Sequence, residues 1–186
     1  MKQWFNEKTV AVIGNAESLF AKDYGDEIDK HDVVVRLNKA AMLYEKFDAE
    51  KSHGTRTDIW MFWRTSEYKR HFSAINTTIK KMHMGHQDRN RLDMTITYYI
   101  YPDELYTPLK KIAGKHSNPT TGFMAIDYIM YYQPKHLSIY GFDWKETPTF
   151  TDPDRKKERI CPHDFEAERK YCMEEVITRT NVSYRN

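Results

Sequence analysis

The chain has 186 residues, of which 40% are hydrophobic, 14% aromatic and 30% charged, and its mean hydropathy is −0.81. Its 13 Tyr, 9 Phe and 4 Trp supply bulky apolar area that disordered chains lack, so we expect one folded domain over residues 1–186. The chain has 29 Lys and Arg against 27 Asp and Glu, a formal charge of +2. This small charge argues against an overall electrostatic attraction to nucleic acid or to a membrane surface.

The predicted strands are short apolar runs rich in β-branched and aromatic residues, at 9–13, 32–37, 58–63, 78–84, 94–100 and 137–142. Apolar residues at helical spacing predict helices over 103–113, 123–132 and 164–178. Continuous apolar strands that alternate with helices are typical of a parallel sheet covered on both faces. We therefore expect an α/β fold: a single Rossmann-like domain with a mostly parallel sheet and helices on both faces.

The sequence contains no run of about 18 apolar residues, so we expect no transmembrane helix. The polar N-terminus leads directly into the first strand and lacks the apolar region of a secretory signal, which predicts a soluble, cytoplasmic protein. The two cysteines, Cys161 and Cys172, have no CxxC spacing and are interpreted as reduced thiols.

The first predicted strand ends in a glycine turn at Gly14 and Asn15. A strand, a glycine turn and a helix start would present free backbone N–H groups to an anion. One glycine stands where the dinucleotide fingerprint GxGxxG requires three, which disfavours NAD and FAD. A tight turn without a ligand is the alternative interpretation.

The second predicted strand ends with Arg36 and Asn38, which are two residues apart and would project from the same face. In an open α/β sheet the carboxyl ends of the strands line the ligand crevice, so neighbouring first and second strands would bring Asn15 and Asn38 together. Neutral amides can bond phosphate and ribose oxygens. Alternatively, Asn38 caps a turn and Arg36 forms an ion pair.

Two further candidates lie near predicted helix starts. Thr120, Thr121 and Gly122 precede the helix at 123–132, where they form either a second anion-binding loop or an ordinary N-cap. His163 precedes the last helix, whose dipole favours the neutral imidazole that a general base requires, although a structural histidine is the alternative. No metal-ligand spacing surrounds His163, so we expect no metal.

Taken together in chain order, the segments described above resemble the sialyltransferases of glycosyltransferase family 29. Residues 10–40 and 54–57 are similar to the large motif of that family, and residues 119–122 and 137–142 resemble its small motif. His163 with Glu168 fits the very small motif, His-x4-Glu. Residues 66–117 show no match.

The resemblance implies the sialyltransferase-like variant of the GT-A fold and metal-independent, inverting transfer of a sugar from a CMP-activated donor to an acceptor hydroxyl, for example on a glycan. By resemblance, His163 is the catalytic base. Glu168 lies five residues later, about 140° further round a helix, so it would not face His163 and is interpreted as a support for the loop. The nucleotide and donor would be held by Gly14, Asn15, Arg36, Asn38, Thr120, Thr121 and Gly122.

The chain departs from the family pattern in two places. It lacks the cysteine pair that joins the large and small motifs in membrane-anchored members, and residues 147–152 replace a His-Tyr motif expected after the small motif. The sugar and the acceptor therefore stay open.

Two other functions are compatible with the sequence. The first is a nucleotide or nucleotide-sugar hydrolase. The second is a non-catalytic module that binds a nucleotide or nucleic acid through the basic segment from Lys69 to Arg91, which lies beside Phe72, Tyr98 and Tyr99.

Overall fold

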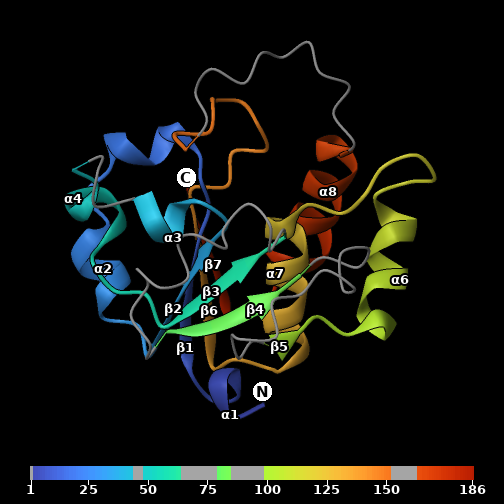
Figure 1. Cartoon of the computed structure of the whole chain (residues 1–186), viewed down its shortest axis with the longest axis horizontal. Coiled ribbons are helices and arrows are strands. Elements are labelled where there is room, and N and C mark those ends of the chain that lie inside the picture. The colour runs from blue at the N-terminus through green and yellow to red at the C-terminus, as the bar shows by residue number, and fades with distance from the viewer. Residues whose placement is uncertain (1, 44–47, 64–78, 85–98, 152–162) are drawn as a thin grey trace.

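The computed structural model describes residues 2–43, 48–63, 79–84, 99–151 and 163–186, and these contain a seven-stranded sheet (Figure 1). The order across the sheet is β5-β4-β3-β2-β1-β6-β7, and every neighbouring pair is parallel. The strands are β1 (Thr9–Ile13), β2 (Val33–Leu37), β3 (Ile59–Phe62), β4 (Lys80–His83), β5 (Tyr99–Ile100), β6 (His136–Tyr140) and β7 (Val182–Arg185). The expected α/β fold with a parallel sheet is confirmed.

Helical segments cover both faces of the sheet, with α2, α3 and α4 on one side and α6, α7 and α8 on the other in Figure 1. They are α1 (Lys2–Phe5), the 3₁₀ helix η1 (Glu17–Ala21), α2 (Gly25–Asp29), α3 (Ala40–Leu43), α4 (Glu50–His53), α6 (Asp103–Ile112), α7 (Thr121–Tyr131), α8 (Phe165–Tyr171) and the π-helical turn η5 (Cys172–Val176).

Two apolar layers follow from the alternation of side chains along the strands. On one face, Val10, Val12 and Val35 pack with the buried residues of α7 in the larger cluster. On the other face, Ala11, Ile13 and Val34 join a smaller cluster with Leu19 of η1 and Ile28 of α2. Both faces of the central strands are therefore apolar, which explains their continuous apolar runs.

Most predicted elements are confirmed within a few residues of their bounds, and residues 94–98 of the fifth predicted strand lie outside the described residues. The last helix was predicted as one α-helix to residue 178, but α8 ends at Tyr171 and continues as the π-helical turn. Strand β7 was not predicted because its residues, Val182–Arg185, are partly exposed and form no apolar run.

Strand β1 lies between β2 and β6, so the chain leaves β1 in one direction and returns on its other side. Such a reversal of strand order opens a crevice outside the carboxyl ends of the strands, where open α/β sheets bind ligands. The register pairs Ile13 of β1 with both Arg36 of β2 and Tyr140 of β6. Gly14 and Asn15, which follow Ile13, therefore lie at the carboxyl ends of the strands, where open α/β sheets bind their ligands.

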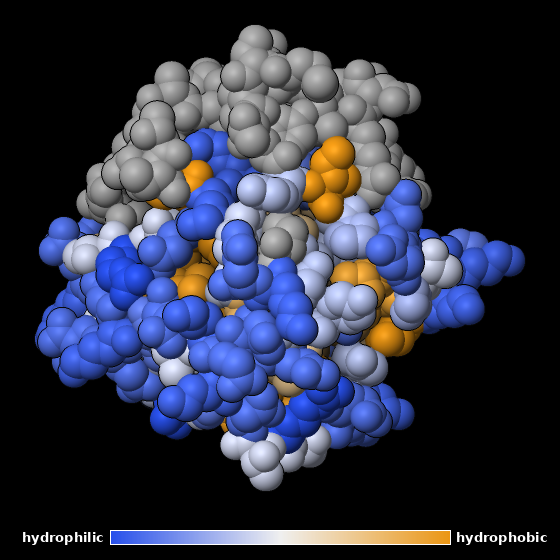
Figure 2. Space-filling model, turned by 90° about the horizontal axis from the view of Figure 1, so that it is seen from below, coloured by the Kyte–Doolittle hydropathy of each residue, from blue (hydrophilic) through white to orange (hydrophobic). Residues whose placement is uncertain are grey.

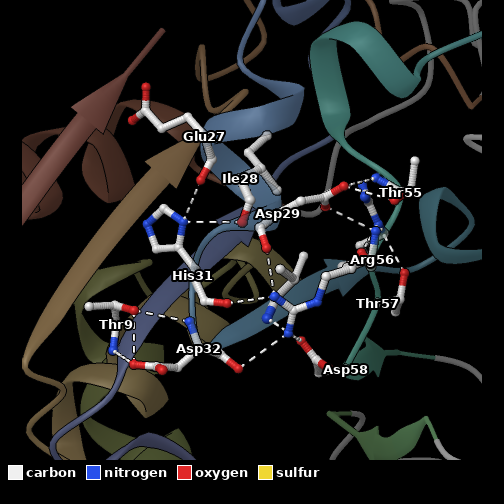
Figure 3. Close-up of polar contacts among 12 residues, drawn as sticks. Thr9, Glu27, Ile28, Asp29, His31, Asp32, Thr55, Arg56, Thr57 and Asp58 are labelled. Carbon is white, nitrogen blue, oxygen red and sulfur yellow. Dashed lines mark hydrogen bonds and ion pairs between the residues drawn. The ribbon is translucent and has the colours of Figure 1, made fainter.

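The opposite edge, at the amino ends of the strands, holds a dense polar network (Figure 3). The Arg56 guanidinium donates to the carbonyls of Asp29 and His31, both at 2.7 Å, and pairs with Asp58 at 2.9 Å. The Asp29 carboxylate accepts the N–H groups of Thr55 (2.8 Å) and Arg56 (3.0 Å), which lower its pKa although burial acts against them. This network ties the ends of α2, β2 and β3 together.

The molecular surface seen from that edge is mostly hydrophilic, and its hydrophobic residues form small separate spots (Figure 2). None of the helices in the described ranges has the length and apolar character needed to cross a bilayer. Cys172 is a buried free thiol, whereas Cys161 lies outside the described residues. The basic segment is described only at residues 79–84.

Candidate active site

The ring of Phe142 brings the two predicted anion-binding loops to one place. A Cβ atom on Gly14 would lie 2.9 Å from Phe142 Cδ2 and 2.2 Å from the carbonyl oxygen of Gly141. A Cβ atom on Gly122 would lie 2.6 Å from Phe142 Cε1. Only glycine fits at either position, and the carboxyl end of β1 therefore lies close to the amino end of α7.

The prediction of free backbone N–H groups in the turn after β1 is wrong for Gly14 and for residues 16–18, and it holds for Asn15, whose N–H has no acceptor among the described residues. The end of β6 and the segment after it lie against this turn, and their carbonyl and hydroxyl oxygens accept the other four N–H groups. The bonds are Gly14 N–H to Tyr140 (2.7 Å), Ala16 N–H to Gly141 (3.2 Å), Glu17 N–H to Pro148 (3.0 Å) and Ser18 N–H to Thr147 Oγ1 (3.2 Å). A ligand at this turn could therefore bind the Asn15 N–H and side chains, but not the other four backbone N–H groups.

The Asn15 side chain is a second polar group at this turn that is available to a ligand. The backbone carbonyl oxygen of Asn15 accepts the N–H of Phe150 at 3.1 Å, which fixes the backbone of the turn. Its Oδ1 atom is buried and has no hydrogen-bond partner among the described residues. An unpaired buried acceptor is costly and requires an explanation, and a bound ligand is one.

Arg36 and Asn38 make separate structural contacts. The fully buried Arg36 donates to the carbonyls of His53 (2.7 Å) and Gly54 (3.0 Å), and so holds the segment before β3. Asn38 has a positive φ of 47°, and its Oδ1 accepts the N–H of Trp63 at 3.1 Å. Asn38 therefore caps a turn, as the alternative interpretation held, while the side-chain N–H₂ group keeps its donor capacity.

Thr120 is the N-cap of α7. Its Oγ1 accepts the N–H of Phe123 at 3.1 Å and donates to Glu168 Oε2 at 2.7 Å, while the Thr120 N–H donates to Glu168 Oε1 at 2.7 Å. Thr120 is thus fully occupied within the protein. The next two backbone N–H groups, of Thr121 and Gly122, have no acceptor among the described residues, as expected for the first turn of a helix. They are the backbone donors that α7 offers to an anion.

The contact with Thr120 also places Glu168, which is fully buried in α8. Burial raises the pKa of its carboxyl to about 7, and the two bonds from Thr120 act in the opposite direction. The helical spacing from His163 predicts that Glu168 supports the loop, and its carboxyl group accepts two hydrogen bonds from Thr120 in the loop before α7.

His163 is bound to the same loop. Its Nδ1 lies 2.6 Å from the carbonyl oxygen of Asn118. Because a carbonyl can only accept, Nδ1 carries the proton, and Nε2 is then the basic nitrogen of the neutral ring. Asn118 itself is held by α6, since its Oδ1 accepts from Lys110 Nζ (3.2 Å) and Tyr106 (3.3 Å).

The loop after β6 connects the two halves of the site. Thr149 forms an isolated bridge with Ala16, next to Asn15, and Lys145 lies over the ring of Phe165, next to His163. Trp144 and Lys145 have φ values of 56° and 73°, a conformation that costs a non-glycine residue on the order of 1–2 kcal/mol. Such strain is frequent at functional sites.

Sequence reasoning missed this loop, the ring of Phe142 and the Asn118 carbonyl. Left-handed backbone at Trp144 and Lys145 has no signal in residue type, because neither is glycine or asparagine. The Phe142 ring and the Asn118 carbonyl act through tertiary contacts that no local pattern encodes. Within the described residues, no group of three or more His, Cys, Asp or Glu side chains could hold a metal ion.

Solved structures with the same fold are sialyltransferases. A mammalian sialyltransferase in complex with Gal-beta-1-3GalNAc-ortho-nitrophenol superposes with a TM-score of 0.66 and 19% identity, over 98% of this chain and 71% of that one. The monofunctional alpha-2,3-sialyltransferase Cst-I of Campylobacter jejuni gives a TM-score of 0.54 and 12% identity, over 94% of this chain and 67% of that one. The fold is therefore that of the sialyltransferases.

Sequence comparison agrees. The model of glycosyltransferase family 29 (sialyltransferase) matches residues 5–96, slightly less than half of the chain. A stretch of 49 residues is 49% identical to the beta-1,6-galactosyltransferase GALT29A of Arabidopsis thaliana. That stretch covers 26% of this chain and only 11% of the relative.

Proposed function

We propose that residues 1–186 act as one nucleotide-sugar-binding domain that transfers a sugar from a CMP-activated donor to a hydroxyl group of a glycan. The observation that carries the proposal is the contact of His163 Nδ1 with the Asn118 carbonyl, because it makes Nε2 the basic nitrogen beside the amino end of α7. The family match supports the donor class.

In the proposed reaction, His163 Nε2 takes the proton of the acceptor hydroxyl as its oxygen attacks the anomeric carbon. The bond from that carbon to the CMP phosphate breaks, the phosphate oxygen keeps the electron pair, and the configuration inverts. The Asn118 carbonyl stabilises the imidazolium that forms and holds the ring in place. Residues of this chain supply each of these effects, so no metal is needed.

The donor would occupy the crevice at the carboxyl ends of β1 and β6. The Asn15 amide would donate to a phosphate oxygen through Nδ2 and accept a hydroxyl of the donor at Oδ1, which relieves that atom's unpaired burial. The Asn38 N–H₂ group and the amides of Thr121 and Gly122 would complete the donor site. Gly14 and Arg36 would act indirectly, through the turn and the segment before β3.

The test is His163→Ala, with His116→Ala as the control because His116 is exposed in a turn after α6. Sugar transfer should fall about 100- to 10,000-fold in His163→Ala, the usual contribution of a general base, while CMP affinity and thermal stability stay unchanged. Unchanged transfer would remove His163 from the mechanism. Equal release of CMP with and without an acceptor would favour the hydrolase instead.

Galactosyl transfer is a second candidate, favoured by the identity with the Arabidopsis galactosyltransferase and by the absence of the His-Tyr motif. Calorimetric titration with CMP, UMP and UDP distinguishes the two. Selective CMP binding supports the first proposal, and selective binding of a uridine nucleotide supports the second.

A further inference from the structure

The amino end of α7 already holds a carboxylate beside the proposed position of the donor phosphate. The Thr120 N–H donates to Glu168 Oε1 at 2.7 Å. The N–H groups of the next two residues, Thr121 and Gly122, have no acceptor among the described residues and are proposed to bind the phosphate. The same donor site includes Asn15, whose buried Oδ1 has no partner in the described chain. The two anions would therefore bind to adjacent donors of one helix start, where salt screens their repulsion only weakly.

The hydrogen bonds of Glu168 are those of an ionised carboxylate. Its Oε2 accepts from Thr120 Oγ1 at 2.7 Å, so both carboxylate oxygens act as acceptors. Thr120 Oγ1 itself accepts the N–H of Phe123 at 3.1 Å, which leaves its own proton for Glu168. Burial raises the pKa of the Glu168 carboxyl to about 7. Glu168 therefore carries its charge at about pH 8 and is neutral at about pH 5.5.

The titratable groups on the elements around Glu168 supply no positive charge. Asp164, at the start of α8, adds to the effect of burial on the pKa of Glu168. The thiol of Cys172 in η5 stays protonated, because burial, Glu168 and Asp127 all raise its pKa. Burial also raises the pKa of Asp127 in α7, although Arg179 acts against it.

The basic groups near Glu168 bind elsewhere. Lys110 of α6, a helix that packs against α8, donates to the loop before α7. His163 is bound to the same loop through Nδ1. Arg169 of α8 pairs with Glu146 at 3.4 Å. Glu168 forms no ion pair in the part of the chain that the structure describes, so its charge is not neutralised there.

The proposed reaction changes the charge of the bound nucleotide. In the donor, the CMP phosphate is a diester with one negative charge. When the bond to the anomeric carbon breaks, the electron pair stays on the phosphate oxygen. The CMP product is then a monoester with about 1.5 to 2 negative charges at neutral pH. A carboxylate at the amino end of α7 therefore repels the product more strongly than the donor.

We propose that the Glu168 carboxylate discriminates between the singly charged donor and the more highly charged CMP product, and so promotes the release of CMP. This inference rests on the proposed transfer from a CMP-activated donor. Glu168 acts through its charge and neither gives nor takes a proton in the reaction.

The test compares CMP with its methyl ester, a diester with one charge, by calorimetric titration at about pH 8. Glu168→Gln removes the charge and keeps an oxygen that accepts from the Thr120 N–H. The variant should bind CMP about three- to thirtyfold more tightly than the wild type, and the methyl ester by a smaller factor, because the repulsion scales with the charge of the ligand. At about pH 5.5, where Glu168 is neutral, the two proteins should agree.

The control is Glu174→Gln, which removes the same charge from an exposed position in η5 and should bind both ligands like the wild type. A second measurement needs no substitution. NMR of labelled glutamate carboxyl groups follows the titration of Glu168 in the wild type. Saturation with CMP should raise the pKa of Glu168 by about one, and the methyl ester should raise it less, because a nearby negative charge disfavours the ionised form.

The outcomes separate this proposal from the proposed function. If the wild type binds CMP and Glu168→Gln leaves the ratio of the two dissociation constants unchanged, the donor site is correct and the discrimination by Glu168 is overturned. Weaker binding of both ligands to a folded variant overturns it as well, because Glu168 then acts by holding the loop. So does a pKa of Glu168 that CMP does not change. If the wild type binds neither ligand, the donor assignment fails and the role of Glu168 fails with it.

Discussion

The amino ends of the strands (the amino edge) and their carboxyl ends (the carboxyl edge) use similar polar residues in opposite ways. At the amino edge, the Arg56 guanidinium donates to the backbone carbonyl of Asp29. The Asp29 carboxylate in turn accepts hydrogen bonds of 2.8–3.0 Å from Thr55 and from the Arg56 N–H (Figure 3). At the carboxyl edge, Asn15 Oδ1 is buried without a partner in the described chain, and Trp144 and Lys145 are strained. Satisfied groups stabilise a fold, whereas unsatisfied buried groups and strained backbone are frequent at functional sites.

The largest effect on stability should come from the amino edge. Arg56→Met removes bonds to the carbonyls of Asp29 and His31 and to the Asp58 carboxylate, so we expect a loss of about 2 kcal/mol in the free energy of unfolding. Urea denaturation measures it.

Lys51→Met is the control for Arg56→Met, since it removes the same charge from an ion pair with Asp23 whose side chains are 78% and 70% exposed. That pair should contribute less than about 0.5 kcal/mol. Equal losses in the two variants would mean that the amino-edge network has no special role in stability.

An intermediate effect should come from Glu168, through pH. Its folded pKa of about 7 lies above the ordinary 4.5, so the folded protein binds more protons than the unfolded chain between these values. The contribution of this group to stability is therefore complete below pH 4.5 and is lost as the pH rises to 7. Glu168→Gln, which stays neutral, should lack this decline.

The measurement is the difference in unfolding free energy between wild type and Glu168→Gln across that range. A difference is needed because His53 changes the stability of both proteins with pH. Burial lowers the pKa of His53 to about 4, so its contribution to stability rises with pH, opposite to that of Glu168. A pH-independent difference would show that the Glu168 carboxyl titrates normally.

The smallest effect on stability should come from Asn15. Asn15→Leu replaces an amide whose Oδ1 has no partner in the described chain, so the free energy of unfolding should change by less than about 0.5 kcal/mol. CMP binding should nevertheless be lost, which calorimetry detects. A large destabilisation with intact binding would reverse the distinction between the two edges.

The parallel sheet could be predicted because its central strands are buried on both faces and so read as continuous apolar runs. His163 and Asn15 could be selected from residue type and from their place at the ends of elements. The sequence could not predict that N–H groups of the turn after β1 are occupied, because their acceptors lie in the segment from Tyr140 to Pro148, far along the chain. Likewise, nothing local predicts that Asn38 turns its Oδ1 to the backbone of Trp63.

The position of β1 between β2 and β6 also affects how the protein folds. One side of β1 pairs with β2, which follows it closely in sequence. The other side pairs with β6, where Thr9 lies opposite His136, so this side stays unpaired until a contact forms across most of the chain. Long-range contacts of this kind slow folding, and an unpaired strand edge can join another chain. Because the turn after β1 and the segment after β6 meet at this junction, the proposed donor site would form only once β1 and β6 have paired. Chains in which this pairing has not formed would expose an aggregation-prone strand edge and lack the site.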